Sequence, residues 1–330
     1  MNFFSIRHLT RFRYSNPVSE SIMEARMHPR SDSNQHCLQF SLSVSPRCRV
    51  FTYRDHLGNN VQHFDIPGEH QQLVIVAESL VEQQPLSDIP YFLAPEAWKA
   101  LDAGVANGDY WEFLMPSEFA RPTDALVELA TELGVVRRDD PMMLLHEINS
   151  RLYDYFSYVP RSTRVDSQID EAIDSRQGVC QDFAHTMIAL VRSVGIPCRY
   201  ISGYLYHTSN HADRSTADAT HAWVEAWLPD LGWVGFDPTN NLIAQYRHIR
   251  TAVGRDYADV PPTRGVFRGQ SSSELYVAVQ VDVHAQPPAL DREMPIPEDW
   301  SVLVEKAQQA ITIPAPHPSE LAQMQQQQQQ

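Results

Sequence analysis

Residues 180–194 limit the possible folds more than any other segment does, because as a helix they would be apolar around most of the circumference. Two adjoining faces are apolar, formed by Phe183, Met187, Leu190 and Val194 and by Ala184, Ile188 and Val191. A helix with so little polar surface is buried inside a domain. Gly195 ends the predicted helix, and Pro197 prevents its resumption. The rest of the chain must therefore supply the elements that surround this helix.

Strand patterns follow the apolar helix. Residues 198–206 and 221–228 have the composition of strands, and a polar loop, 210–220, separates them. The residues P-D-L-G at 229–232 predict a tight turn, after which 233–236 return beside the preceding strand. We therefore expect an antiparallel sheet against the helix.

The N-terminal part of the chain is predicted to be β structure. Apolar residues alternate with polar ones most clearly at Leu38, Phe40, Leu42 and Val44. Turn formers at 55–60 predict a hairpin, and 73–77 predict a short buried strand. Helical spacing of apolar residues predicts a helix that starts at Pro141. Strict alternation over 275–283 predicts one more strand, so the chain is an α+β protein.

We expect four parts along the chain. Residues 1–84 form an N-terminal β domain, and 85–122, which prolines interrupt, form a connecting segment. Residues 123–290 form the core that contains the apolar helix and, in this prediction, the last strand. Residues 291–330 form an extension with a glutamine-rich end, which we expect to be unstructured because its composition is of low complexity.

Charge and composition exclude several classes of function. The formal net charge of -15 would repel a nucleic-acid backbone. No segment is long and apolar enough to cross a bilayer, and charged side chains interrupt residues 1–14, unlike a secretion signal. We therefore expect a cytoplasmic protein that binds neither nucleic acid nor a membrane.

The four cysteines lack C-x-x-C spacing, which argues against a disulfide framework and against a zinc cluster.

Cys180 begins the apolar helix. The unpaired N–H groups and the positive dipole end at a helix N-terminus stabilise a thiolate, and the same N–H groups can bind an oxyanion. Gly178, two residues earlier, would let a substrate approach the backbone closely. Most single cysteines are inert packing residues, so the position of Cys180 indicates catalysis only together with suitable partners.

His221 and Asp237 are the predicted partners of Cys180. His221 begins a strand directly after the polar loop, where its imidazole can take the proton of the thiol. Asp237 ends the next strand of the same hairpin, where a carboxylate can orient and stabilise the charged ring. Taken singly, His221 is explained as a surface histidine and Asp237 as a turn residue before a proline. Together, the order Cys, His, Asp predicts a catalytic triad.

Four motifs carry a resemblance to a known family. They are G-V-C-Q-D-F-A-H from Gly178, G-I-P-C-R-Y-I-S-G-Y from Gly195, H-A-W-V-E-A-W from His221 and G-W-V-G-F-D-P-T-N from Gly232. In this order they resemble the bacterial transglutaminase-like core, whose fold is similar to that of papain-like thiol enzymes.

The resemblance implies a cysteine-bearing helix packed on an antiparallel sheet, with Cys180, His221 and Asp237 as nucleophile, base and orienting carboxylate. The β-rich region before the core is similar to the N-terminal domain often joined to this core in bacteria. The residues G-R-D-Y-A-D-V-P-P-T-R-G from Gly254 are similar to the family's extension after the core.

Three neighbours of the triad are further candidates for binding substrate or an oxyanion: Gln181, Asp182 and Trp223. Gln181 and Asp182 lie in the first turn of the helix, where dipole contacts and capping explain them equally well. Trp223 lies on a predicted strand, where packing is the plainer explanation.

The predicted reaction is cysteine-dependent acyl transfer on amide or peptide carbonyls through a thioester. Water as acceptor would make the protein a protease or amidase, and an amine would make it a transamidase. The expected partner is a protein or peptide with a carboxamide or amide bond; its identity, the acceptor and the oligomeric state are left open. No cofactor or metal is implied, since the calcium-loop pattern D-x-[DN]-x-[DN]-G is absent.

Two alternatives belong to other classes of function. A non-catalytic binding or scaffold protein can keep this fold, although it has no need of all three triad residues. An acetyl-CoA-dependent N-acetyltransferase also uses Cys, His and Asp on a similar core, but the long β region before Cys180 argues against it.

Overall fold

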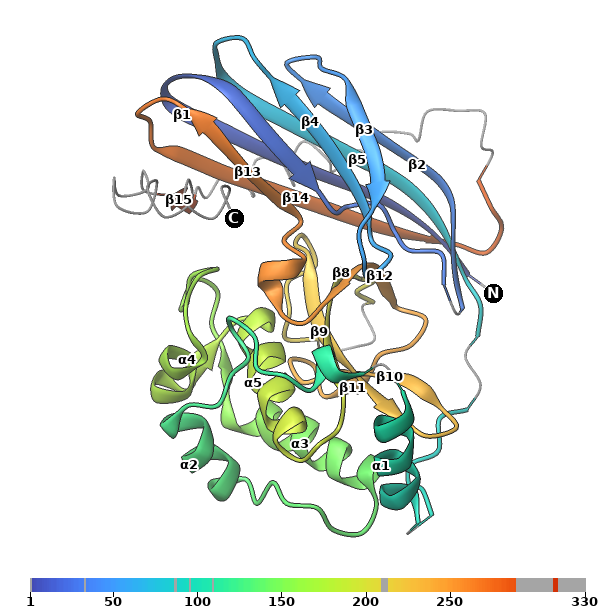
Figure 1. The fold of residues 1–330 in the computed structure, drawn as a ribbon. Helices are drawn as coiled ribbons and strands as arrows, with labels where there is room; N and C mark the ends of the chain where they lie inside the picture. Colours follow the sequence, from blue (N-terminus) through green and yellow to red (C-terminus); the bar gives the residue numbers. More distant parts are fainter. Residues whose placement is uncertain are drawn as a thin grey trace.

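The computed structural model of the chain describes residues 2–32, 34–85, 88–94, 96–108, 110–208, 213–288 and 311–313. A large β sheet lies on one side of the molecule, and a second sheet with the helices lies on the other (Figure 1). Among the described residues, no helix combines the length and apolar character needed to cross a membrane. Most of the predicted unstructured extension, 291–330, lies outside the described residues.

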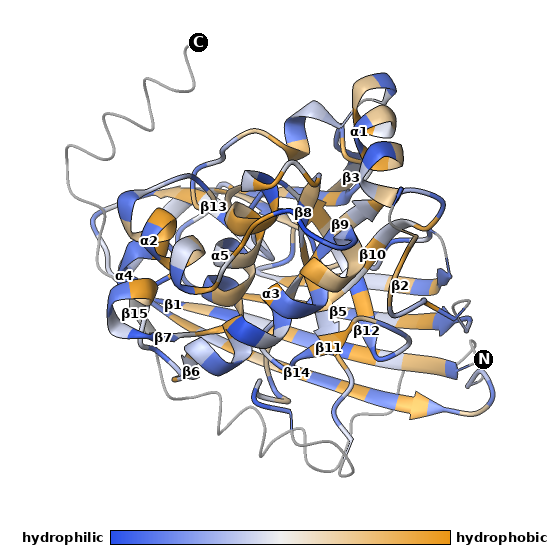
Figure 2. Cartoon of the chain, turned by 90° about the horizontal axis from the view of Figure 1, so that it is seen from below, coloured by the Kyte–Doolittle hydropathy of each residue, from blue (hydrophilic) through white to orange (hydrophobic). Residues whose placement is uncertain are grey.

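Among the described residues, the large sheet has eight antiparallel strands, of which the long strand β1 (Asn2–Ala25) is the central one. The first half of β1 pairs with β5 (His70–Gln83) on one side and with β14 (Ser273–His284) on the other. Its last residues pair with β4 (Asn60–Ile66) and β13 (Thr263–Arg268). Apolar and polar residues alternate along β1 and β14, and Figure 2 shows them as successive bands of orange and blue. One face of the sheet is therefore buried.

Three more strands complete the large sheet: β2 (Gln35–Ser45) pairs with β5, β3 (Val50–Arg54) with β4 and β15 (Ile311–Ile313) with β14. The predicted hairpin is confirmed, since β3 and β4 pair around a turn in which Oδ1 of Asp55 accepts the N–H groups of Leu57 and Asn59. Gly58 in this turn has a φ of +76°, a backbone conformation that favours glycine.

The strand predicted over 275–283 exists as β14, but its assignment to the catalytic core was wrong. It pairs with β1 in the large sheet, where Ile6 lies opposite Val281 and Thr10 opposite Val277. Alternation predicts that one face of a strand is buried, but it does not identify the sheet that receives the strand. The strand β14 therefore belongs to the N-terminal β region.

Five α-helices are described: α1 (Ala97–Asn107), α2 (Asp124–Glu132), α3 (Pro141–Tyr155), α4 (Ile169–Ser175) and α5 (Cys180–Ser193). The helix predicted from Pro141 is α3, and Asp140 caps it by accepting the N–H groups of Met142 and Met143. The sequence analysis did not predict α1, which lies in the expected connecting segment. Only Ala97 and Leu101 of α1 are buried, and prolines at 95 and 116 flank the helix in the sequence.

The second sheet has the strand order β11-β10-β9-β8-β12. Its strands are β8 (Cys198–Leu205), β9 (His221–Leu228), β10 (Gly232–Asp237), β11 (Leu242–Ile243) and β12 (His248–Gly254). The buried helix α5 packs against β8 and β9 and is surrounded by the other helices (Figure 1). This arrangement of a buried helix on an antiparallel sheet is the predicted α+β core.

Candidate active site

Cys180 is the first residue of α5, directly after a short parallel pairing of β6 (Ser157–Tyr158) with β7 (Gln177–Gly178). Its thiol is partly exposed, whereas the rest of α5 is almost wholly buried. The first N–H groups of any helix have no partner inside the helix, so donors lie close to this sulfur. The position suits a nucleophile that a substrate can reach.

His221 and Asp237 meet across the hairpin of β9 and β10. His221 is the first residue of β9 and Asp237 the last of β10, and these antiparallel strands pair up to Phe236 and Val224. Nε2 of His221 lies 2.8 Å from Oδ2 of Asp237. Both side chains are buried, so solvent screens this interaction little.

Opposing effects set the pKa values of this pair. Burial lowers the pKa of His221, but the charge and hydrogen bond of Asp237, together with the thiol of Cys180, raise it to about 10. Burial favours the neutral form of Asp237, but interactions with two neighbouring histidines hold its pKa well below the ordinary value. At neutral pH the pair is therefore an imidazolium and a carboxylate.

Cys180 lies near the imidazole of His221. Its thiol is one of the groups that raise the pKa of this histidine. Nε2 of the ring faces Asp237, so Nδ1 is left to face the sulfur. Nδ1 has no partner of standard hydrogen-bond geometry among the described residues, which makes the contact with the thiol a loose one. Catalytic contacts of this kind tighten when substrate binds. The structure thus brings the three predicted triad residues together.

Three tyrosines lie near the sulfur: Tyr158, Tyr200 and Tyr257. Burial is the largest cause that raises the pKa of each phenol, and the nearby Cys180 raises it further. The pKa values of Tyr158 and Tyr257 are raised to about 12, so both hydroxyls stay protonated and can donate hydrogen bonds. The sequence analysis missed these residues, because the parallel pairing that places Tyr158 opposite Gly178 leaves no local pattern.

Gln181 and Asp182 attach the loop at 159–168 to the start of α5. Nε2 of Gln181 donates to the carbonyl of Val165 at 3.0 Å. Oδ2 of Asp182 accepts from Oγ1 of Thr163 at 2.5 Å and from the N–H of Val179 at 2.8 Å. These contacts shape the surroundings of Cys180. A direct role of either side chain in binding substrate or an oxyanion stays a prediction.

Trp223 is buried beside His221. Its ring stacks on that of His221 with the centroids 6.0 Å apart. Gly203 on β8 makes room for it, since a Cβ there would lie 2.7 Å from the indole and 2.1 Å from a backbone carbonyl. Trp223 therefore supports the imidazole, and its predicted contact with substrate is untested.

His248 and Asn240 are site residues that the sequence analysis did not identify. Nε2 of His248 lies 3.1 Å from Oδ2 of Asp237, and Nδ2 of Asn240 lies 2.9 Å from the same oxygen. Oδ1 of Asn240 also accepts the N–H groups of Arg214 and Ser215, which anchors the loop before His221. The Asn in D-P-T-N was visible in the sequence, but no pattern there links His248 to Asp237.

One nitrogen of His221, one nitrogen of His248 and one oxygen of Asp237 lie within 4.8 Å of one another. Such a cluster has the donor types of a metal site. Here the two histidines share one carboxylate oxygen through hydrogen bonds, which accounts for the short distances.

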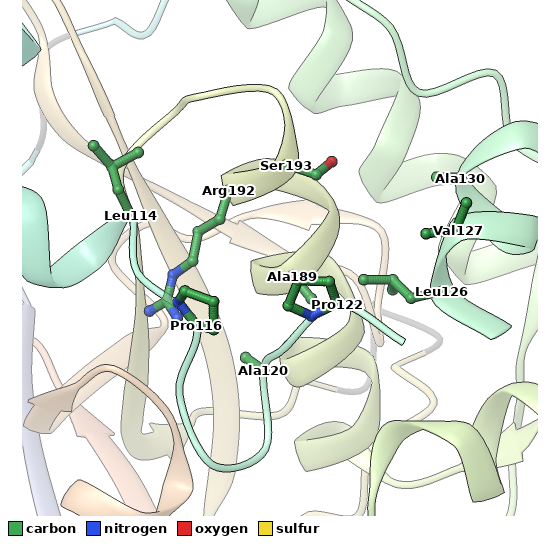
Figure 3. Close-up of a pocket in the computed structure, with 10 residues that line it drawn as sticks. All are labelled: Leu114, Pro116, Ala120, Pro122, Leu126, Val127, Ala130, Ala189, Arg192 and Ser193. Carbon is green, nitrogen blue, oxygen red and sulfur yellow. The ribbon is translucent and has the colours of Figure 1, made fainter. Parts of the chain in front are cut away.

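A cavity of about 160 Å³ opens beside the last turns of α5 (Figure 3). Ala189, Arg192 and Ser193 line one side of it, and residues of α2 and of the segment 114–122 line the other. Cys180 lies at the first residue of the same helix, and no triad residue lines the cavity. This cavity is therefore separate from the candidate active site.

Two family models match the chain. The model described as the bacterial transglutaminase-like N-terminal region matches residues 4–82. The model described as the transglutaminase-like superfamily matches residues 131–238. The second match contains Cys180, His221 and Asp237, whereas His248 lies beyond its end.

Relatives cover most of the chain. An uncharacterized protein of Mycobacterium tuberculosis is 34% identical over 85% of this chain and 92% of its own length. Another, from Mycobacterium leprae, is 31% identical over 83% of this chain and 96% of its own length. A protein-glutamine gamma-glutamyltransferase of Pseudomonas aeruginosa is 37% identical, but over only 38% of this chain and 20% of its own length.

A solved structure has the same fold. It is described as that of a candidate cysteine protease from Cytophaga hutchinsonii. The TM-score is 0.67 at 24% sequence identity, and the match covers 89% of this chain and 92% of that one. The likeness therefore extends over both the large sheet and the helical part.

Proposed function

Since this chain belongs to the transglutaminase-like superfamily, we propose that it is an enzyme that transfers acyl groups from amides through a thioester on Cys180. The observation that supports the proposal most directly is the buried pair of His221 and Asp237 at 2.8 Å, with the partly exposed Cys180 near enough to the imidazole to raise its pKa. The proposed substrate is a protein or peptide that offers a carboxamide or amide bond.

In the proposed reaction, the Cys180 thiolate attacks the carbonyl carbon and the carbonyl oxygen takes the negative charge. The His221 imidazolium then gives its proton to the leaving nitrogen, which departs as ammonia or an amine, and the C–S bond remains as a thioester. Asp237 keeps the imidazolium oriented and charged until that transfer. Neutral His221 next takes a proton from water or an acceptor amine, which attacks the thioester and releases the thiol.

We assign the oxyanion donors to the N–H groups at the start of α5 and to the hydroxyl of Tyr158. Both lie beside the sulfur, and the raised pKa of Tyr158 keeps its proton in place. Donors fixed in position before the reaction stabilise the developing charge without having to reorganise. The parallel β6–β7 pairing immediately before the nucleophile places Tyr158 opposite Gly178.

Intact-mass measurement after incubation with a glutamine-containing peptide tests the proposal. We expect an acyl adduct on the native chain, its removal by hydroxylamine, and no adduct on Cys180→Ala. Cys48→Ala is the matched control, because Cys48 is also a partly exposed free thiol but lies in the N-terminal β region. Equal labelling of native chain and Cys180→Ala contradicts the proposal.

Repeating the same incubation with and without methylamine identifies the acyl acceptor. Release of the free acid identifies hydrolysis, and formation of the methylamide identifies transamidation. The absence of both products, with no thioester on the native chain, refutes acyl transfer on amides.

A further inference from the structure

The Asp237 carboxylate accepts more hydrogen bonds than a triad requires. Oδ2 accepts from Nε2 of His221, Nε2 of His248 and Nδ2 of Asn240 at 2.8, 3.1 and 2.9 Å. Oδ1 accepts the backbone N–H groups of Thr239 and Asn240 at 3.1 and 3.2 Å. A carboxylate held by this many donors is fixed in orientation and kept ionised.

His248 differs from the other donors because it comes from a strand on the far side of the sheet. β12, which carries it, is separated from β10 by β8 and β9. Burial lowers the pKa of His248, and the nearby His221 and Arg247 add to this effect, while Asp237 opposes it. His248 is therefore neutral and donates through Nε2–H. A neutral donor fixes the carboxylate without placing a second positive charge beside the imidazolium.

β12 is an edge strand of the second sheet, called here the catalytic sheet because it carries His221 and Asp237. Side chains of the N-terminal β region occupy the outer edge of β12. The carboxamide of Gln35 accepts the N–H of Arg250 and donates to its carbonyl, each at 2.8 Å. The carboxamide of Asn59 makes the same two bonds with Val253, each at 2.8 Å. Each carboxamide thus bonds to the N–H and carbonyl groups of β12 as the backbone of a neighbouring strand would.

A third carboxamide reaches the residue that carries the imidazole. Nε2 of Gln83, at the end of β5, donates to the backbone carbonyl of His248 at 3.0 Å and to Oε1 of Gln35 at 3.1 Å. Gln35, Asn59 and Gln83 are each at most 2% exposed. Buried backbone groups and carboxamides are costly when unpaired, so these bonds strongly favour one position of β12.

We propose that His248 is a positioning residue of the catalytic site, and that the N-terminal β region acts on the triad by holding β12, and hence His248, against Asp237. The inference rests on the proposed function of Cys180, His221 and Asp237. The N-terminal β region would thus contribute to the active site indirectly, since the donors to Asp237 belong to His221, Thr239, Asn240 and His248.

The test measures how fast iodoacetamide alkylates Cys180 as a function of pH, with peptide mapping to separate the thiols. Burial raises the pKa of Cys37 to about 11 and that of Cys198 to about 12, so these two react slowly at neutral pH. We expect His248→Met, which fills similar space without a donor, to lower the rate at pH 7 about tenfold, the effect of one hydrogen bond to a charged group. His248→Gln, which keeps a donor, should stay within about threefold of the native rate.

A merely structural role predicts a different result. Thermal melting would then fall in His248→Met while the pH profile of alkylation kept its midpoint. Equal alkylation rates in the Met and Gln variants overturn the inference.

The link to the N-terminal region is tested with Gln83→Leu, for which we expect a fall of about threefold in the alkylation rate, consistent with the loss of one neutral hydrogen bond. Gln72→Leu is the matched control, because Gln72 lies on the same strand but is exposed. Equal rates in the two variants overturn the link.

His221→Ala, measured in parallel, separates the two proposals. If it leaves the alkylation rate unchanged, the proposed triad itself fails. If it lowers the rate while His248→Met does not, the triad stands and only the positioning role fails.

Discussion

The N-terminal β region and the catalytic sheet each bury a histidine, and the two differ in charge. His8 on β1 bonds through Nδ1 to the hydroxyl of Tyr204 at 3.0 Å and through Nε2 to that of Thr10 at 3.1 Å. Burial among neutral partners lowers the pKa of His8 to about 4, whereas Asp237 and Cys180 raise that of His221 to about 10 despite burial. Burial alone makes a neutral packing residue, and only an adjacent charge makes a proton carrier.

The same contrast gives the two regions opposite responses to pH. His8 is neutral when folded, so stability falls as the pH drops from 6.5 towards 4, where only the unfolded chain binds the proton. His221 is charged when folded, so its contribution is complete below pH 6.5 and is lost as the pH rises towards 10. Acid therefore removes the contribution of the neutral His8, and alkali removes that of the charged His221.

The largest effect is expected when the negative charge beside His221 is removed, because His221 should then titrate as His8 does. In Asp237→Asn, we expect the pKa of His221 to fall below 6.5, as for His8, and the rate of thioester formation to fall about 10⁴-fold. NMR titration of the imidazole and turnover of the glutamine peptide measure the two effects. Asp174→Asn, at an exposed position of α4, is the control. A cationic His221 at pH 8 in Asp237→Asn contradicts the assignment.

Acid unfolding tests the neutral histidines. Burial lowers the pKa of His8 to about 4 and that of His185 to about 3. Because only the unfolded chain binds these protons, each histidine should lower the free energy of unfolding by about 2 kcal/mol as the pH falls from 7 to 5. Urea titrations at pH 7 and at pH 5 measure the combined loss in the free energy of unfolding. A free energy of unfolding that does not change over this interval shows that these rings are not neutral in the folded chain.

The smallest expected effect is that of a substitution within the N-terminal β region. His8→Gln should cost about 1 kcal/mol at pH 7, because it disturbs hydrogen bonds to Tyr204 and Thr10. It should also make the acid loss of stability about 2 kcal/mol smaller, since one titrating ring is gone. Alkylation of Cys180 should keep its native rate. Urea titration checks the first two expectations, and an unaltered acid loss refutes the assignment to His8.

Local patterns predicted much of what the structure contains. The hairpin at β3 and β4, the cap at Asp140 and the buried helix from Cys180 depend on residues that are close in the sequence. The family and the α+β fold expected from the four motifs are confirmed by the matches to known proteins. The short helix α1 was not predicted, because prolines interrupt the segment 85–122 and only two residues of α1 are fully buried.

The order of residue types along the chain was enough to single out Cys180, His221 and Asp237, because a helix start and a tight hairpin are local structures. The place of β14, the approach of Tyr158 to the sulfur and the second histidine on Asp237 were decided by contacts between distant segments. Strand edges and carboxamides offer the same donors and acceptors wherever they occur, so only the folded arrangement selects which of them meet.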